Sequence, residues 1–121
     1  MKKIIHVDNS EFFRKQMKTF LEKEGFEVES FDGAHEANLV IGGGGGDMII
    51  MGLAFADATG EEFLTRTLES FAGPFVVVSS SVDNDKAKKL AGLGAKAAFN
   101  KSGAWKESLK PHLVALKAGK T

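Results

Sequence analysis

The chain has 121 residues, the length of one globular domain, with 16 basic residues, 16 acidic residues and no cysteine. The balanced charge gives no basic surface for nucleic acid or for an anionic membrane. The lack of cysteine excludes disulfides, thiol catalysis and cysteine-ligated metals, and no apolar run is long enough for a signal peptide or a membrane span. We therefore expect a single cytoplasmic domain over residues 1–121.

Short apolar runs alternate with helical hydrophobic periodicity along the whole chain. In chain order they predict a strand over 3–8, a helix over 10–24, a strand over 26–31, a helix over 34–41, a strand over 47–51, a helix from about 61 to 71, a strand over 74–79, a helix from 83 or 84 to 90, a strand over 95–100 and a last helix through Leu109, Leu113 and Leu116. Pro111 suits the last helix if the helix begins near Ser108, and would kink a helix that begins at Ala104.

Five strands that alternate strictly with five helices predict a parallel sheet covered by helices on both faces. We expect two helices on one face and three on the other. In such sheets the functional crevice lies at the carboxyl ends of the strands. The residues that the pattern brings to this edge are Asp8, Asn9, Gly52, Ser79, Ser80 and Lys101.

Five segments of the chain resemble the receiver domains of two-component response regulators. They are residues 6–10, 47–53, 59–64, 77–79 and 94–101, and the resemblance extends over nearly the whole chain. It implies a three-layer (βα)5 fold of flavodoxin-like, or CheY-like, topology. It also implies a chemistry in which an aspartate that ends the third strand accepts a phosphoryl group from a histidine kinase. Two acids after the first strand would hold Mg²⁺, and a Ser or Thr and a Lys after the fourth and fifth strands would bind the acylphosphate.

The aligned positions depart from that pattern. Gly52 stands at the phospho-acceptor position and Asn9 at the second acid, which leaves Asp8 as the one carboxylate, whereas Ser79 and Lys101 match. One carboxylate without a phosphate should bind Mg²⁺ weakly, and we expect no other metal or cofactor. The chain thus resembles a degenerate receiver, or pseudo-receiver, and we expect it not to be an enzyme.

The loss of the neighbouring acids leaves Asp8 as the natural partner of Lys101, so an ion pair between them is expected. Ser102 stands where the family often has a proline that follows the lysine through a cis peptide bond. A cis bond before any other residue costs about 3–4 kcal/mol, so we predict a trans bond between Lys101 and Ser102. With a trans bond, the loop after the last strand should take a different path. Such a path would let Lys101 point away from the old phosphate site, as an alternative to the ion pair.

The resemblance implies a signalling module that acts through protein contacts of the fourth helix, the fifth strand and the fifth helix. The residues expected on this face are Lys86, Lys89, Ala98 and Trp105. The expected partners are a histidine kinase, an output domain or a chemotaxis-type target. Two alternatives stay open: a regulator phosphorylated at a shifted acceptor, Asp57 or Asp47, and a domain that binds a small anion in the vacated phospho-site through Ser79 and Lys101.

Overall fold

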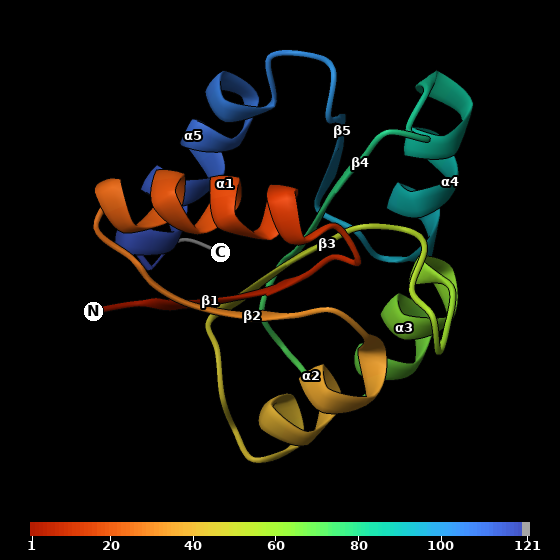
Figure 1. Ribbon diagram of the computed structural model, residues 1–121, viewed down its shortest axis with the longest axis horizontal. Helices are drawn as coiled ribbons and strands as arrows, with labels where there is room; N and C mark the ends of the chain where they lie inside the picture. The colour runs from red at the N-terminus through yellow and green to blue at the C-terminus, as the bar shows by residue number, and fades with distance from the viewer. Residues whose placement is uncertain (120–121) are drawn as a thin grey trace.

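The computed structural model describes residues 1–119 and contains five strands and five helices in strict alternation (Figure 1). The strands are β1 (Lys3–Val7), β2 (Glu27–Phe31), β3 (Met48–Met51), β4 (Phe75–Ser79) and β5 (Ala97–Asn100). The helices are α1 (Glu11–Lys23), α2 (Ala34–Gly42), α3 (Gly60–Thr67), α4 (Asn84–Leu93) and α5 (Trp105–Lys117). The predicted order and type of all ten elements are confirmed. Residues 120 and 121 of the expected domain lie outside the described part.

All neighbouring strands are parallel, in the spatial order β2-β1-β3-β4-β5. Helices α1 and α5 cover one face of the sheet, and α2, α3 and α4 cover the other (Figure 1). The expected division into two and three helices is therefore confirmed, as is the flavodoxin-like doubly wound topology. None of the described helices is both long and apolar enough to cross a lipid bilayer.

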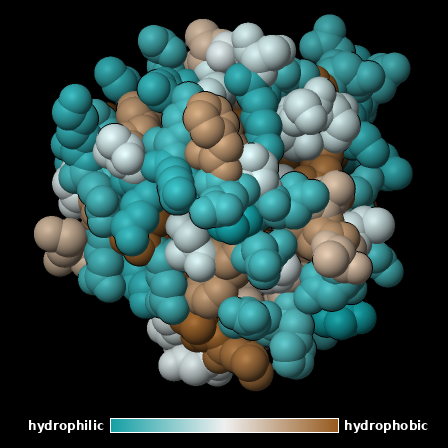
Figure 2. Space-filling model, in the orientation of Figure 1, coloured by the Kyte–Doolittle hydropathy of each residue, from teal (hydrophilic) through white to brown (hydrophobic). Residues whose placement is uncertain are grey.

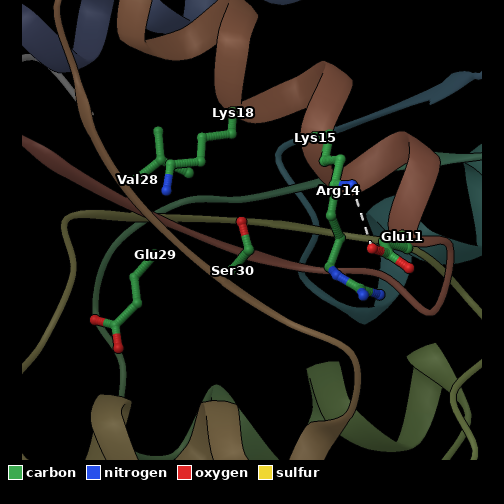
Figure 3. Close-up of a pocket in the computed structure, with 7 residues that line it drawn as sticks. All are labelled: Glu11, Arg14, Lys15, Lys18, Val28, Glu29 and Ser30. Atoms are coloured by element: carbon green, nitrogen blue, oxygen red, sulfur yellow. Dashed lines mark ion pairs between the residues drawn. The ribbon is translucent and has the colours of Figure 1, made fainter.

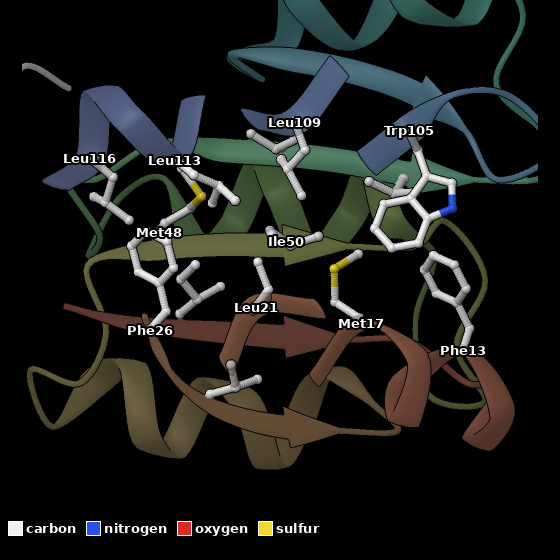
Figure 4. Packing of buried hydrophobic residues seen from close by; sticks show 14 residues of the cluster. Phe13, Met17, Leu21, Phe26, Met48, Ile50, Trp105, Leu109, Leu113 and Leu116 are labelled. Atoms are coloured by element: carbon white, nitrogen blue, oxygen red, sulfur yellow. The ribbon is translucent and has the colours of Figure 1, made fainter. Parts of the chain in front are cut away.

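Successive residues of each strand supply two separate cores because side chains alternate between the faces of a sheet. Ile4 belongs to the cluster under α1 and α5, whereas its neighbour Ile5 belongs to the cluster under the other three helices. Figure 4 shows the first cluster, to which α1 contributes Leu21 and α5 contributes Leu113. The two cores thereby hold helices against both faces of the sheet.

Local sequence sets the ends of most helices. The Ser10 hydroxyl accepts a hydrogen bond from the Phe13 amide (3.2 Å), and the Asp83 carboxylate accepts one from the Lys86 amide (2.8 Å). Gly94 ends α4 with a φ of 118°, a left-handed conformation that favours glycine. Helix α5 has the earlier of its two predicted starts. It begins at Trp105, so Pro111 lies inside it.

Candidate functional site

The topology brings the predicted site residues to one edge of the sheet. Asp8 directly follows β1, Gly52 directly follows β3, and Lys101 directly follows β5, while Ser79 is the last residue of β4. Because β1 and β3 are hydrogen-bonded neighbours, the amide of Gly52 donates to the carbonyl of Val7 (2.9 Å). Asp8 and Gly52 are thus held side by side.

Lys101 forms an ion pair with Asp8. Its Nζ lies 3.0 Å from Oδ2 and 3.2 Å from Oδ1, and it donates a hydrogen bond to Oδ1. The Asp8 side chain is 1% exposed and that of Lys101 is 23% exposed, so the pair is largely removed from water. The expected pair is confirmed, and the alternative in which Lys101 points away is wrong. A buried carboxylate needs a cation, and Lys101 is within reach although its bond to Ser102 is trans, as predicted.

Helix α1 holds both members of the ion pair in place. The Ser10 amide donates to Oδ1 of Asp8 (2.8 Å), and Nη1 of Arg14 donates to the Asp8 main-chain carbonyl (2.7 Å). The ammonium of Lys101 also lies 4.3 Å from the centre of the Phe13 ring, in a cation–π contact. The first turn of α1 therefore contacts each charge of the pair.

Gly52 presents no side chain to this cluster. It is buried, and a Cβ added to it would lie 3.0 Å from Oδ2 of Asp8. Its backbone is not in the left-handed region, so other residues can adopt its conformation. The end of β3 thus lies against the Asp8 carboxylate, with no group of its own that could accept a phosphoryl group.

Two of the predicted site residues do not join the ion pair. The Ser79 hydroxyl lies 3.1 Å from the Ser81 hydroxyl and accepts a hydrogen bond from the Ser81 amide (3.3 Å). Asn9 is exposed, and within residues 1–119 its side chain makes no hydrogen bond to another residue. The edge therefore brings together Asp8, Gly52 and Lys101, and leaves the side chains of Ser79 and Asn9 outside.

Sequence reasoning missed Asn100, which positions two loops at this edge. Its Nδ2 donates to the carbonyls of Ser80 (3.2 Å) and Val82 (2.8 Å), and its Oδ1 accepts from the amide of Ser102 (2.8 Å). Asn100 thereby ties the loop after β4 to the loop that carries Lys101. The signal available in the sequence was a lone amide side chain at the end of an apolar strand.

The cluster does not fit a Mg²⁺ site. Mg²⁺ demands octahedral oxygen ligands and is usually held by one or two carboxylates together with phosphate. Here Asp8 is a single carboxylate, and its oxygens already face the ammonium of Lys101 and the amide of Ser10. Within residues 1–119 no group of three or more His, Asp or Glu side chains is placed to hold a metal ion.

His6 lies in β1 two residues before Asp8 and is fully buried. Burial lowers its pKa to about 4, and the nearby charges of Lys101 and Arg14 act in the same direction while Asp8 opposes them. Its ring packs edge-on against Phe13, with ring centres 5.8 Å apart. The imidazole is therefore neutral at pH 7.

Neither predicted shifted acceptor faces the edge. The Asp57 carboxylate accepts hydrogen bonds from the amides of Ala34 (3.0 Å) and His35 (2.9 Å) at the start of α2, and these bonds lower its pKa. Asp57 thus caps α2 in place of Gly33, which has no capping side chain. Asp47 precedes β3, at the opposite end of the strand from Gly52, where its Oδ2 accepts from the Lys3 amide (2.8 Å).

The residues predicted for an interaction face have different surroundings. Lys86 pairs with Glu61 of α3 (2.9 Å), Lys89 is 63% exposed with its Nζ 3.9 Å from the same carboxylate, and Ala98 is half-buried against the core beneath α4. Trp105 contributes almost no surface to this face. It is 5% exposed and packs in the core.

Trp105 is buried because α5 begins at this residue and directs its ring toward α1. The ring centre lies 5.2 Å from that of Phe13 and 5.5 Å from that of Phe20, and both contacts are edge-to-face. Figure 4 shows Trp105 and Phe13 at one end of the core, and the Lys101 ammonium lies over the Phe13 ring. Trp105 therefore supports Phe13 and, through it, the Lys101 ammonium.

Comparison with known proteins gives one sequence family. Residues 4–110 match the family described as the response regulator receiver domain. Comparison with curated protein sequences gives no match.

Solved structures give the same fold at low identity. A two-component response regulator from Clostridium difficile has a TM-score of 0.86 at 18% identity, over 98% of this chain and 97% of that one. A CheY-like receiver domain protein from Methanospirillum hungatei JF-1 has a TM-score of 0.86 at 22% identity, over 98% and 95%. The chemotaxis response regulator CheY4 of Vibrio cholerae has a TM-score of 0.78 at 23% identity, over 96% and 98%.

Proposed function

This chain belongs to the response regulator receiver domain family, and we propose that it is a pseudo-receiver, which signals through protein contacts and accepts no phosphoryl group at the end of β3. One observation carries the proposal. Gly52 occupies the end of β3 and lies against the carboxylate of Asp8, where an acceptor would need a carboxylate of its own. Glycine has no atom that can form an acylphosphate.

The charges at the edge support the same proposal. The ammonium of Lys101 balances the carboxylate of Asp8 within the chain, so the edge needs neither Mg²⁺ nor phosphate to compensate its charge. Breaking a buried pair of this kind costs several kcal/mol because it leaves one charge uncompensated. The proposed module therefore keeps one arrangement of Lys101 whether or not a phosphoryl donor is present.

The two alternative functions have weaker support. Phosphorylation of Asp57 would remove the acceptor for two amides at the start of α2, and Asp47 lies at the far end of β3. An anion at the edge would have to compete with Asp8 for Lys101, and the Ser79 hydroxyl faces Ser81.

We propose that partners contact the face formed by α4, β5 and α5. Strand β5 is an edge of the sheet, and Lys89 on α4 projects with 63% of its side chain exposed. A histidine kinase, an output domain or a chemotaxis-type target in the cytoplasm would each present a protein surface to it. This assignment rests on the family and on the exposure of Lys89.

Phosphorylation in solution tests the proposed function. The protein is incubated with acetyl phosphate and Mg²⁺, and its intact mass is measured beside that of a receiver domain that has an acceptor aspartate. We expect a phosphoryl adduct on the comparison domain and none on this chain. A stoichiometric, hydroxylamine-labile adduct would contradict the proposal, and its loss in Asp57→Asn would identify the shifted acceptor.

A further inference from the structure

A groove lies between α1 and the edge strand β2. Neither Asp8 nor Lys101 lines it, although its lining residue Arg14 also donates to the Asp8 carbonyl. It has a volume of about 450 Å³. Figure 3 shows Arg14 and Lys18 reaching from α1 on either side of Ser30, whose hydroxyl points from β2 toward the helix. Helix α1 and the sheet thus both supply polar groups to this groove.

Buried polar atoms without hydrogen-bond partners lie in the groove, at Ser30, and on the neighbouring residue of β1, His6. The Ser30 hydroxyl and both ring nitrogens of His6 are buried and have no partner within residues 1–119. His6 and Ser30 are registered neighbours on β1 and β2, so their side chains share the face beneath α1. Buried polar atoms in folded proteins almost always have a partner. Because Ser30 lines the groove, its unpartnered hydroxyl indicates a group that the protein itself does not provide.

The charges that line the groove leave two cations without an acidic partner. Glu11 pairs with Lys15 (3.3 Å), and Glu29 pairs with Lys3 (2.5 Å). Within the described residues neither Arg14 nor Lys18 belongs to an ion pair. Arg14 uses Nη1 for the Asp8 carbonyl, which leaves further guanidinium N–H groups free to donate.

We propose that this groove binds a small molecule that bears a phosphate group. A guanidinium, an ammonium and a hydroxyl are the donors that recognise phosphate oxygens, and charge-assisted bonds from Arg are the strongest of them. Here the donors come from two sides and the floor, which suits a tetrahedral anion better than a planar carboxylate. The site lies on α1 and β2, so it is separate from the vacated phospho-site of the receiver family and does not depend on the proposed function.

The test is an NMR titration of the ¹⁵N-labelled chain with inorganic phosphate, and with sodium acetate at matched ionic strength. We expect the amides of Arg14, Lys18 and Ser30 to shift and saturate with phosphate, and acetate to bind more weakly. Ser30→Ala and Arg14→Gln should each weaken phosphate binding by about tenfold, the effect of one hydrogen bond to a charged group. Lys23→Gln is the matched control, because it removes one positive charge from α1 outside the groove, and it should leave binding unchanged.

Ser30→Ala is expected to keep the fold, because it removes a single hydroxyl and leaves Arg14 in contact with Asp8. A loss of phosphate binding in this variant therefore does not reflect misfolding. Shifts that never saturate would overturn the proposal. The proposal would also be overturned if Lys23→Gln weakened phosphate binding as much as Arg14→Gln does, because the phosphate would then be attracted by the overall positive charge of α1. A third outcome would also overturn the proposal. If the amides of Gly52, Ser79 and Lys101 shift and saturate, and Ser30→Ala does not weaken this binding, the anion lies in the vacated phospho-site instead.

Discussion

The buried histidine of β1 should make the stability of this domain depend steeply on pH. His6 is fully buried, and burial lowers its pKa from 6.5 to about 4. Its folded-state pKa therefore lies below the value in the unfolded chain, which binds the proton more readily. The stability that comes from a neutral imidazole is fully present above about pH 6.5 and is lost as the pH falls toward 4.

The size of the effect follows from the two pKa values. Because one pKa unit corresponds to about 1.4 kcal/mol, the whole difference is worth about 3 kcal/mol. Integrated between about pH 7 and about pH 5, His6 alone should lower the free energy of unfolding by about 2 kcal/mol. This loss is a large fraction of the free energy of unfolding of a typical domain, which is about 5–15 kcal/mol.

Urea unfolding of the wild type and of His6→Leu at both pH values isolates this contribution. The carboxylates and His112 are common to both chains, so they cancel in the difference. Wild type should lose about 2 kcal/mol more than His6→Leu on acidification. The exposed His35 is the matched control, and His35→Gln should keep the pH dependence of the wild type. Equal losses in wild type and His6→Leu would refute the reasoning, because they would show that His6 accepts a proton in the folded state.

Three further changes test the ion pair, the cap of α2 and the ancestral site. Lys101→Met should lower the free energy of unfolding by about 3 kcal/mol, because Asp8 would stay buried without a cation, and a loss below about 1 kcal/mol in urea unfolding would contradict this. Asp57→Ala should lower the midpoint of urea unfolding because two hydrogen bonds at the start of α2 are lost, and an unchanged midpoint would show that water replaces the cap. The Asn9→Asp/Gly52→Asp variant should be less stable than wild type without metal, since Gly52→Asp places a second carboxylate against Asp8 and Asn9→Asp adds a third on the next residue, and Mg²⁺ should raise its melting temperature. Scanning fluorimetry should show almost no Mg²⁺ response in wild type, and an equal shift in both would show that these positions do not converge.

The order of elements could be predicted from the sequence because each signal was local. Apolar runs such as residues 48–51 are buried on both faces of the sheet, and Ser10 and Gly94 mark helix ends through their own backbone or side-chain chemistry. The strand ends then fixed which residues meet at the carboxyl edge. Asp8 and Gly52 become neighbours through topology alone.

Side-chain directions at the edge needed information from other elements. Trp105 stands at the start of α5, and Pro111 favoured a later start that would have left Trp105 in a loop. Its burial depends on Phe13 and Phe20, which come from a helix far away in the sequence. The direction of Lys101 likewise depends on a buried carboxylate 93 residues earlier. No periodicity in the sequence encodes either contact.

Helix α1 and its cap contact both members of the ion pair between Asp8 and Lys101. Ser10 and Arg14 hydrogen-bond to Asp8, and Phe13 lies under the ammonium of Lys101. All three belong to the cap and first turn of α1, which the core fixes through Phe13 and Trp105. A change at α1 can therefore reach the loop after β5 through direct contacts, with no phosphoryl group involved. In the proposed pseudo-receiver, the cap and first turn of α1 therefore hold Lys101 at the edge without a phosphoryl group.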